Sequence, residues 1–178
     1  MSNRVVRAGL AGGLVGGLVM AGFAMVMMWL AGSGFWTPVN LIAHTFWRSA
    51  PLDGRFSLAA AVIGVAVHML VATMFATVIA AGACRLPGRR SLVIAGGIVF
   101  TAVLWPVMQD VVWHALDAAA AGDFTTWVFA SAHLVFGAVA ASMAAIAVPD
   151  ADATPPRHAL PRQPAQPRSW FTPSGQRR

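Results

Sequence analysis

Residues 8–31 read AGLAGGLVGGLVMAGFAMVMMWLA, and this apolar run contains no charged residue. A membrane helix needs about 20 mostly apolar residues to cross about 30 Å of hydrocarbon. The run is long enough, and it exceeds the apolar part of a secretory signal, which is about 7 to 15 residues long. We therefore expect a membrane helix here that is retained in the mature protein.

Three more apolar runs follow, so the sequence predicts an all-α fold, a four-helix transmembrane bundle. Composition agrees, because 58% of the chain is hydrophobic and 10% is charged, whereas a soluble domain is about a quarter charged. After the last run the chain is rich in Pro and Arg, and we expect it to form a disordered basic tail. The predicted spans are 8–31, 57–84, 92–116 and 125–148, and the predicted tail is 149–178.

The arginines beside the spans predict the orientation. Most lie before the first span, between the second and third spans, or in the tail, whereas Arg48 and Arg55 lie on the opposite side. The positive-inside rule therefore predicts a multi-pass protein of the bacterial inner membrane with both termini in the cytoplasm. Tryptophans favour the headgroup layer, and six of them fall at the ends predicted to face outward: Trp29, Trp36, Trp47, Trp105, Trp113 and Trp127.

The first connection contains the segment TPVNLIAHTFWR at residues 37–48. Thr37 can cap a helix and Pro38 suits its first position, while the apolar residues that follow gather on one side. The segment therefore predicts a short interfacial helix lying on the outer surface. The residues expected at the headgroup level are Trp36, His44 and Trp47.

Glycines recur at four-residue spacing in the first span, a pattern typical of a glycine zipper. Small residues let membrane helices approach closely, and the second and fourth spans carry similar stripes of small residues. The pattern leaves the neighbour open: it is either another helix of the same chain or a second copy in a homo-oligomer. The expected packing positions are Gly9, Gly13, Gly17, Gly64 and Gly137.

Polar residues also occur inside the spans. His68 and His133 lie on the small-residue stripes of the second and fourth spans, so both are expected to point into the bundle. Asp110, His114 and Asp117 follow at i, i+4 and i+7 on the third span and should share one helix face. An intramembrane aspartate needs a partner, and the candidates are His68, His114 and His133. Pro106, one turn away, should kink this helix.

These polar residues allow three interpretations. They form a hydrogen-bonded network that holds a structural or accessory membrane protein together, or a proton or solute path of a small transporter that uses Asp110 and a histidine. In the third, His68 and His133 bind haem b, or Asp110, His114 and His133 bind a divalent metal.

Other activities find no support in the sequence. We expect no catalytic residue, because the sequence contains no Glu, no Lys, one cysteine and no hydrolase or nucleotide-binding motif. The arginines lie between apolar runs instead of on an ordered face, so the expected partner is the lipid bilayer and not nucleic acid.

The segment FWTPVNLIAHTFW at residues 35–47, between a Gly-rich span and a span with a central histidine, resembles small four-helix bacterial membrane proteins of uncharacterised function. The resemblance covers roughly residues 4–148 and is most specific in the Pro-x-Asn-Leu-Ile-x-His stretch. Some such proteins carry sodium:solute symporter names, but four spans are too few for a symporter of ten or more. The resemblance therefore implies a fold and no established activity or catalytic residue.

Overall fold

A computed structural model describes residues 3–147, and within this range the fold is all-α, as predicted. The predicted tail at 149–178 and the last residue of the predicted fourth span lie outside the described residues. The elements are α1 (Asn3–Leu30), α2 (Thr37–His44), α3 (Leu58–Ala83), α4 (Arg90–Pro106), the π-helix η1 (Val107–Trp113), α5 (His114–Leu116), α6 (Ala118–Asp123) and α7 (Thr126–Ala147).

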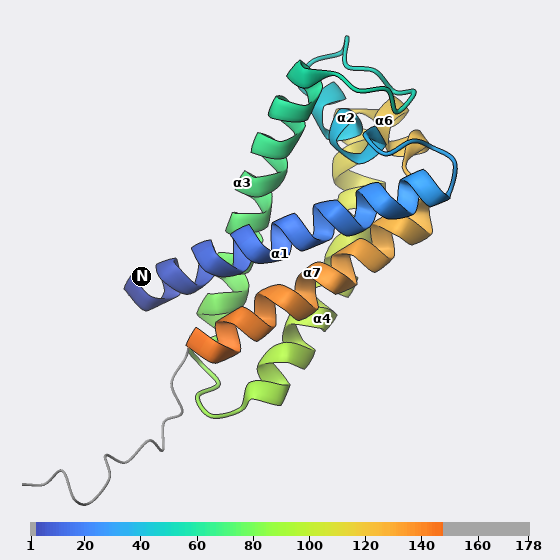
Figure 1. Cartoon of the computed structure of the whole chain (residues 1–178). Helices are drawn as coiled ribbons and strands as arrows, with labels where there is room; N and C mark the ends of the chain where they lie inside the picture. The colour runs from blue at the N-terminus through green and yellow to red at the C-terminus, as the bar shows by residue number, and fades with distance from the viewer. Residues whose placement is uncertain (1–2, 148–178) are drawn as a thin grey trace, which may run out of the picture.

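Four stretches are long and apolar enough to cross a membrane, which confirms the prediction of a multi-pass membrane protein. They are Asn3–Leu30, Leu58–Ala83, Arg90–Leu116 and Thr126–Ala147. The beginning of α1 and the end of α7 lie at one end of the bundle, while α2 and α6 lie at the other (Figure 1). We call this second end the α2 end.

The glycines of α1 serve two neighbours within the chain. A Cβ added at Gly9 or Gly13 would collide with Thr77 or Thr73 of α3. At Gly12, one helical face away, a Cβ would lie 3.3 Å from the backbone oxygen of Ala140 in α7. The glycine rows therefore let α1 pack closely against both α3 and α7.

The other predicted packing glycines also face helices of the same chain. A Cβ at Gly17 would lie 3.0 Å from Ala72 of α3, and one at Gly137 would collide with Thr101 of α4. At Gly64 the neighbour is the backbone of Val39 in α2. In the described chain, all five glycines thus face an internal partner.

The prediction that α2 lies on the surface is wrong. The helix ends at His44 and not at residue 48, and every residue in it except Ile42 is buried. Because Gly64 has no side chain, the backbone of α2 packs directly onto α3. The helix is therefore part of the bundle, which it closes at the α2 end.

The third span is not a single kinked α-helix. It changes to π-helix at Val107, directly after Pro106, and ends as the short α5. Proline lacks the amide donor that an α-helix needs and crowds the preceding turn. A π-helix pairs residues i and i+5 and so widens each turn. Positions that would share a face of an α-helix therefore separate.

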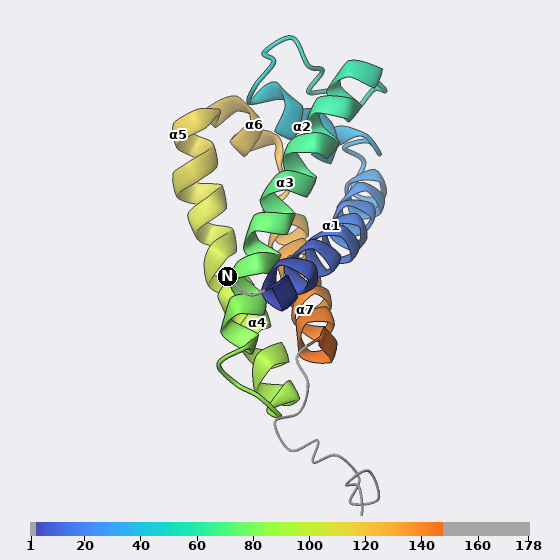
Figure 2. The ribbon, with the colours of Figure 1, turned by 90° about the vertical axis from the view of Figure 1, so that its left-hand side faces the viewer.

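Helices α3 and α4 are joined by a tight turn, yet they scarcely touch along their length. Phe75 of α3 and Phe100 of α4 meet with ring centroids 6.2 Å apart. Beyond this pair, α3 and the η1–α5 segment diverge toward the α2 end (Figure 2). The space between them holds the candidate site.

Candidate functional site

A cavity of about 210 Å³ lies in this space. Residues of α1, α3, η1 and α7 line it, and residues of α2 cover it at the α2 end. Its lining is almost entirely apolar and includes Met20, Val39, Val71, Met108 and Phe136. Such a lining suits a lipid-soluble molecule better than an ion or a polar solute.

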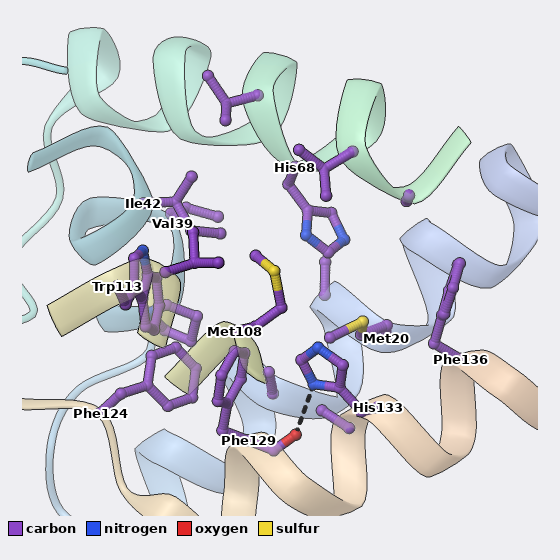
Figure 3. Close-up of a pocket in the computed structure, with 18 of the residues that line it drawn as sticks. Met20, Val39, Ile42, His68, Met108, Trp113, Phe124, Phe129, His133 and Phe136 are labelled. Atoms are coloured by element: carbon purple, nitrogen blue, oxygen red, sulfur yellow. Dashed lines mark hydrogen bonds between the residues drawn. The ribbon is translucent and has the colours of Figure 1, made fainter. Parts of the chain in front are cut away.

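His68 and His133 both line this cavity, as their place on the small-residue stripes predicted. His68 comes from α3 and His133 from α7, and their rings point toward one another (Figure 3). The Nε2 of His68 lies 2.9 Å from the carbonyl oxygen of Gly17. The Nδ1 of His133 lies 2.9 Å from the carbonyl oxygen of Phe129.

Aromatic rings form one wall of the cavity. Trp113 of η1 stacks on Phe129 of α7 with centroids 5.1 Å apart, and Phe124 contacts both rings. Phe129 in turn meets the ring of His133 edge-on at 4.3 Å. Trp113 is 8% exposed, so its ring packs within this cluster and does not face the lipid.

Asp110 does not join the histidines. Its side chain is exposed, and among the described residues it has no hydrogen-bond partner. His114 is exposed too, and its Nδ1 pairs with the carbonyl oxygen of Gln109 at 2.7 Å. The expected Asp110–histidine pair is therefore absent, because the π-helical turn directs Met108 and Trp113 into the bundle and Asp110 outward.

Asp117 is the buried carboxylate of this region, and it does not share a face with Asp110. Its side chain is 1% exposed; Oδ2 lies 2.6 Å from Nδ1 of His44, and Oδ1 lies 2.6 Å from Nη1 of Arg48. The Ala120 amide donates to Oδ1 at 3.2 Å, so Asp117 also caps α6. The second guanidinium nitrogen of Arg48 donates to the carbonyl of Leu116 at 2.7 Å.

This cluster ties α2 and the residue stretch after it to α6. Burial alone would raise the pKa of Asp117, but hydrogen bonds from His44 and the Ala120 amide and the charges of His44 and Arg48 outweigh it and hold this pKa below its usual value. The carboxylate is therefore ionised at neutral pH. Since Ile42 of α2 lines the cavity, the cluster fixes part of its roof.

The predicted metal ligands are not brought together. Asp110 and His114 are exposed, whereas His133 faces the cavity, and the described residues contain no group of three His, Cys, Asp or Glu side chains placed to bind a metal. The predicted haem ligands, His68 and His133, do face one another. However, the cavity of about 210 Å³ is smaller than the range of about 300–1,000 Å³ that is usual for cofactor pockets.

The remaining predicted interfacial residues have mixed positions. Trp47 is 36% exposed, and Trp36 is half-buried against Phe35 and Phe56. His44, expected at the headgroup level, is buried on Asp117. The sequence contained one indication of the His44–Asp117 pair. Asp117 comes directly after the third span, where an aspartate can cap a following helix by accepting a hydrogen bond from a backbone amide three residues later.

Comparisons of the chain with models of protein families, with curated proteins and with solved structures found no match. The site therefore rests on its own geometry.

Proposed function

We propose that this chain is a small accessory membrane protein that binds a lipid-soluble molecule, rather than catalysing a reaction. The observation that carries the proposal is the apolar cavity of about 210 Å³ between α3 and η1. A cavity of about 150 Å³ is large enough to bind benzene. The observed space can therefore take a ring-sized head group.

The side of the cavity between α3 and η1 supports access from the bilayer. Val71 of α3 and Val112 of η1 line the cavity and are half-buried. Their neighbours Leu70 and Val111 are 73% and 61% exposed, so they face the lipid. A ligand with an apolar tail can therefore place its head in the cavity and leave its tail among the lipid chains.

The polar groups fit binding better than proton transport. A proton path through the cavity needs a chain of exchanging groups, and Asp110, the acid expected to supply it, is exposed on the other side of η1. Each cavity histidine is instead held by a backbone carbonyl. Arginines favour the cytoplasmic side, and most of them flank the ends of the spans opposite the α2 end. Because the cavity lies toward the α2 end, we propose that it occupies the outer half of the membrane.

The test uses 1-bromo-4-pentylbenzene and the full chain in lipid nanodiscs. Bromine quenches nearby tryptophan, and Trp113 lines the cavity. We expect saturable quenching of wild type that Trp113→Phe removes and that Val112→Phe, which narrows the cavity, weakens at least tenfold. Val111→Phe is the matched control, because it adds the same ring one residue away on the lipid-facing side. Quenching that never saturates, or equal effects of the two valine variants, would refute the proposal.

A further inference from the structure

The hydrogen bonds of the two cavity histidines fix where their protons lie. A backbone carbonyl accepts hydrogen bonds and cannot donate them. The Nε2 of His68, 2.9 Å from the Gly17 oxygen, and the Nδ1 of His133, 2.9 Å from the Phe129 oxygen, must therefore each carry a hydrogen. In a neutral imidazole the other ring nitrogen then has a free lone pair.

These second nitrogens, Nδ1 of His68 and Nε2 of His133, have no hydrogen-bond partner within residues 3–147. Neither is among the buried polar atoms that lack a partner, which in this part of the chain are oxygens of Asn40 and Gln109. Both nitrogens therefore border open space, and both rings line the cavity and point toward one another (Figure 3). This end of the cavity offers two hydrogen-bond acceptors.

The size of the cavity separates the ligand classes. A metal ion needs its ligands about 2 Å away, whereas the space of about 210 Å³ exceeds the roughly 150 Å³ that holds benzene. Phe129, edge-on to His133 at 4.3 Å, gives this space an aromatic wall. A substituted ring fits these dimensions, and an isolated ion leaves most of the space empty.

From these observations we infer that the cavity binds a hydroxyl-bearing ring, a phenol or hydroquinone with an apolar tail, whose hydroxyl hydrogens are donated to the free nitrogens of His68 and His133. The inference rests on the proposed lateral binding of a lipid-soluble molecule and names its chemical class. It also predicts selectivity, because the oxygens of a quinone only accept hydrogen bonds. The reduced ring therefore binds more tightly than the oxidised ring.

Competition against the bromo probe in nanodiscs at pH 8, where an imidazole of ordinary pKa is neutral, tests the class. The competitors are 4-pentylphenol, its methyl ether 4-pentylanisole and pentylbenzene, each corrected for its partition into protein-free nanodiscs. We expect the phenol to compete about tenfold better than the ether, which is the effect of one hydrogen bond to a buried acceptor. We also expect tert-butylhydroquinone to compete at least tenfold better than tert-butylbenzoquinone.

The variants His68→Phe and His133→Phe separate hydrogen bonding from cavity shape. Each removes one acceptor and keeps a ring, so each should reduce the preference for phenol over ether while the bromo probe still binds. If a phenylalanine variant no longer binds 1-bromo-4-pentylbenzene, it has lost its cavity. The variants His68→Gln and His133→Gln are then used instead. Because glutamine keeps an acceptor oxygen, these variants should retain the preference for phenol over ether.

The outcomes distinguish the inference from the proposal beneath it. Equal competition by phenol and ether, or by hydroquinone and quinone, overturns the ligand class but leaves lateral binding in place. Failure of every probe to bind wild type overturns both. Tight stoichiometric binding of Cu⁺ or Zn²⁺ that His133→Phe abolishes and that displaces the phenol would assign the free nitrogens to a metal and overturn the inference.

Discussion

The two faces of α3 are built from side chains of different size. Toward α1, Thr73 and Thr77 pack on glycines, and the helices approach until added Cβ atoms would collide. Toward η1, Val71 faces Met108 and Val112 across the cavity, and the helices stay apart. One helix thus takes part in a sealed seam and in an open cavity.

The difference in packing between the two faces of α3 follows from the lipid environment of the helices. In lipid there is little hydrophobic drive to bring apolar helices together, so contact depends on how closely their surfaces fit. Small residues allow a close fit, whereas valine, methionine and phenylalanine keep helix backbones apart. The size of the side chains therefore decides where this bundle is closed and where it retains space for a ligand.

The largest expected effect comes from the same substitution made in both kinds of region. Ala140 of α7 is 1% exposed and packs against Gly12 and Gly16 of α1, whereas Ala21 of α1 is half-buried and lines the cavity. We expect Ala140→Leu to lower the free energy of unfolding by about 3 kcal/mol through overpacking, and Ala21→Leu to raise it by about 1 kcal/mol by filling space. Denaturant titrations in one detergent measure the difference of about 4 kcal/mol.

Equal losses from the two leucines would contradict the comparison, because they would show that the cavity side is as tightly packed as the seam. The exposed alanine at 95 in α4 provides the baseline. Ala95→Leu changes the same side chain on the lipid-facing surface, and we expect it to alter the free energy of unfolding by less than about 0.5 kcal/mol.

Gly64 tests the sealed contact between α3 and α2. A Cβ there collides with the backbone of Val39, which cannot move aside as a flexible side chain would. We expect Gly64→Ala to cost about 2 to 3 kcal/mol in unfolding free energy. Gly96→Ala is the control, because a Cβ at Gly96 has no neighbour within 4 Å, and it should instead stabilise α4 by about 0.5–1 kcal/mol. A Gly64→Ala protein as stable as wild type would show that α2 does not rest on α3.

The roof of the cavity depends on Asp117. Asp117→Asn keeps the shape but removes the charge that His44 and Arg48 face at 2.6 Å. Because the Arg48 side chain is 58% exposed, we expect a loss of about 2 kcal/mol, below that of a fully buried pair. Asp53→Asn is the control: its 3.5 Å pair with Arg55 is exposed and should contribute less than about 0.5 kcal/mol. Indistinguishable losses would mean that the Asp117 cluster does not hold α2.

The same cluster predicts a dependence on acid. Since folding lowers the pKa of Asp117, its contribution is fully present above the unfolded value of about 3.9 and is lost as the pH falls through the folded pKa. The unfolding free energies of wild type and Asp117→Asn should therefore differ at pH 6 and converge as the pH drops below 4. A gap that stays constant to pH 3 would exclude ionised Asp117 as its source.

Much of this molecule could be predicted from residue patterns. The apolar runs predicted the four spans, because length and hydropathy suffice when lipid is the solvent. The stripes of small residues predicted that His68 and His133 point inward, and both line the cavity. These features depend on local periodicity, which an α-helix preserves over its whole length.

The residues whose positions were predicted wrongly depend on contacts between distant segments or on a change of helix type. His44 and Asp117 meet across 73 residues, a distance over which the sequence carries no periodic signal. The burial of α2 depends on Gly64. A glycine allows close packing, but the sequence does not specify whether the neighbour is α2, another helix or a second copy of the chain. The π-helix after Pro106 changed the period itself, so a face assigned by α-helical spacing was wrong for Asp110.

Asp110 gives the smallest expected effect and the sharpest contrast with Asp117. Its side chain is exposed and unpaired within the described residues, so Asp110→Asn removes no internal contact. We expect the unfolding free energy in detergent to change by less than about 0.5 kcal/mol, and the competition between 4-pentylphenol and its ether to stay as in wild type. A loss comparable to that of Asp117→Asn would show that Asp110 does reach a partner, and the outward course of η1 would then have to be revised.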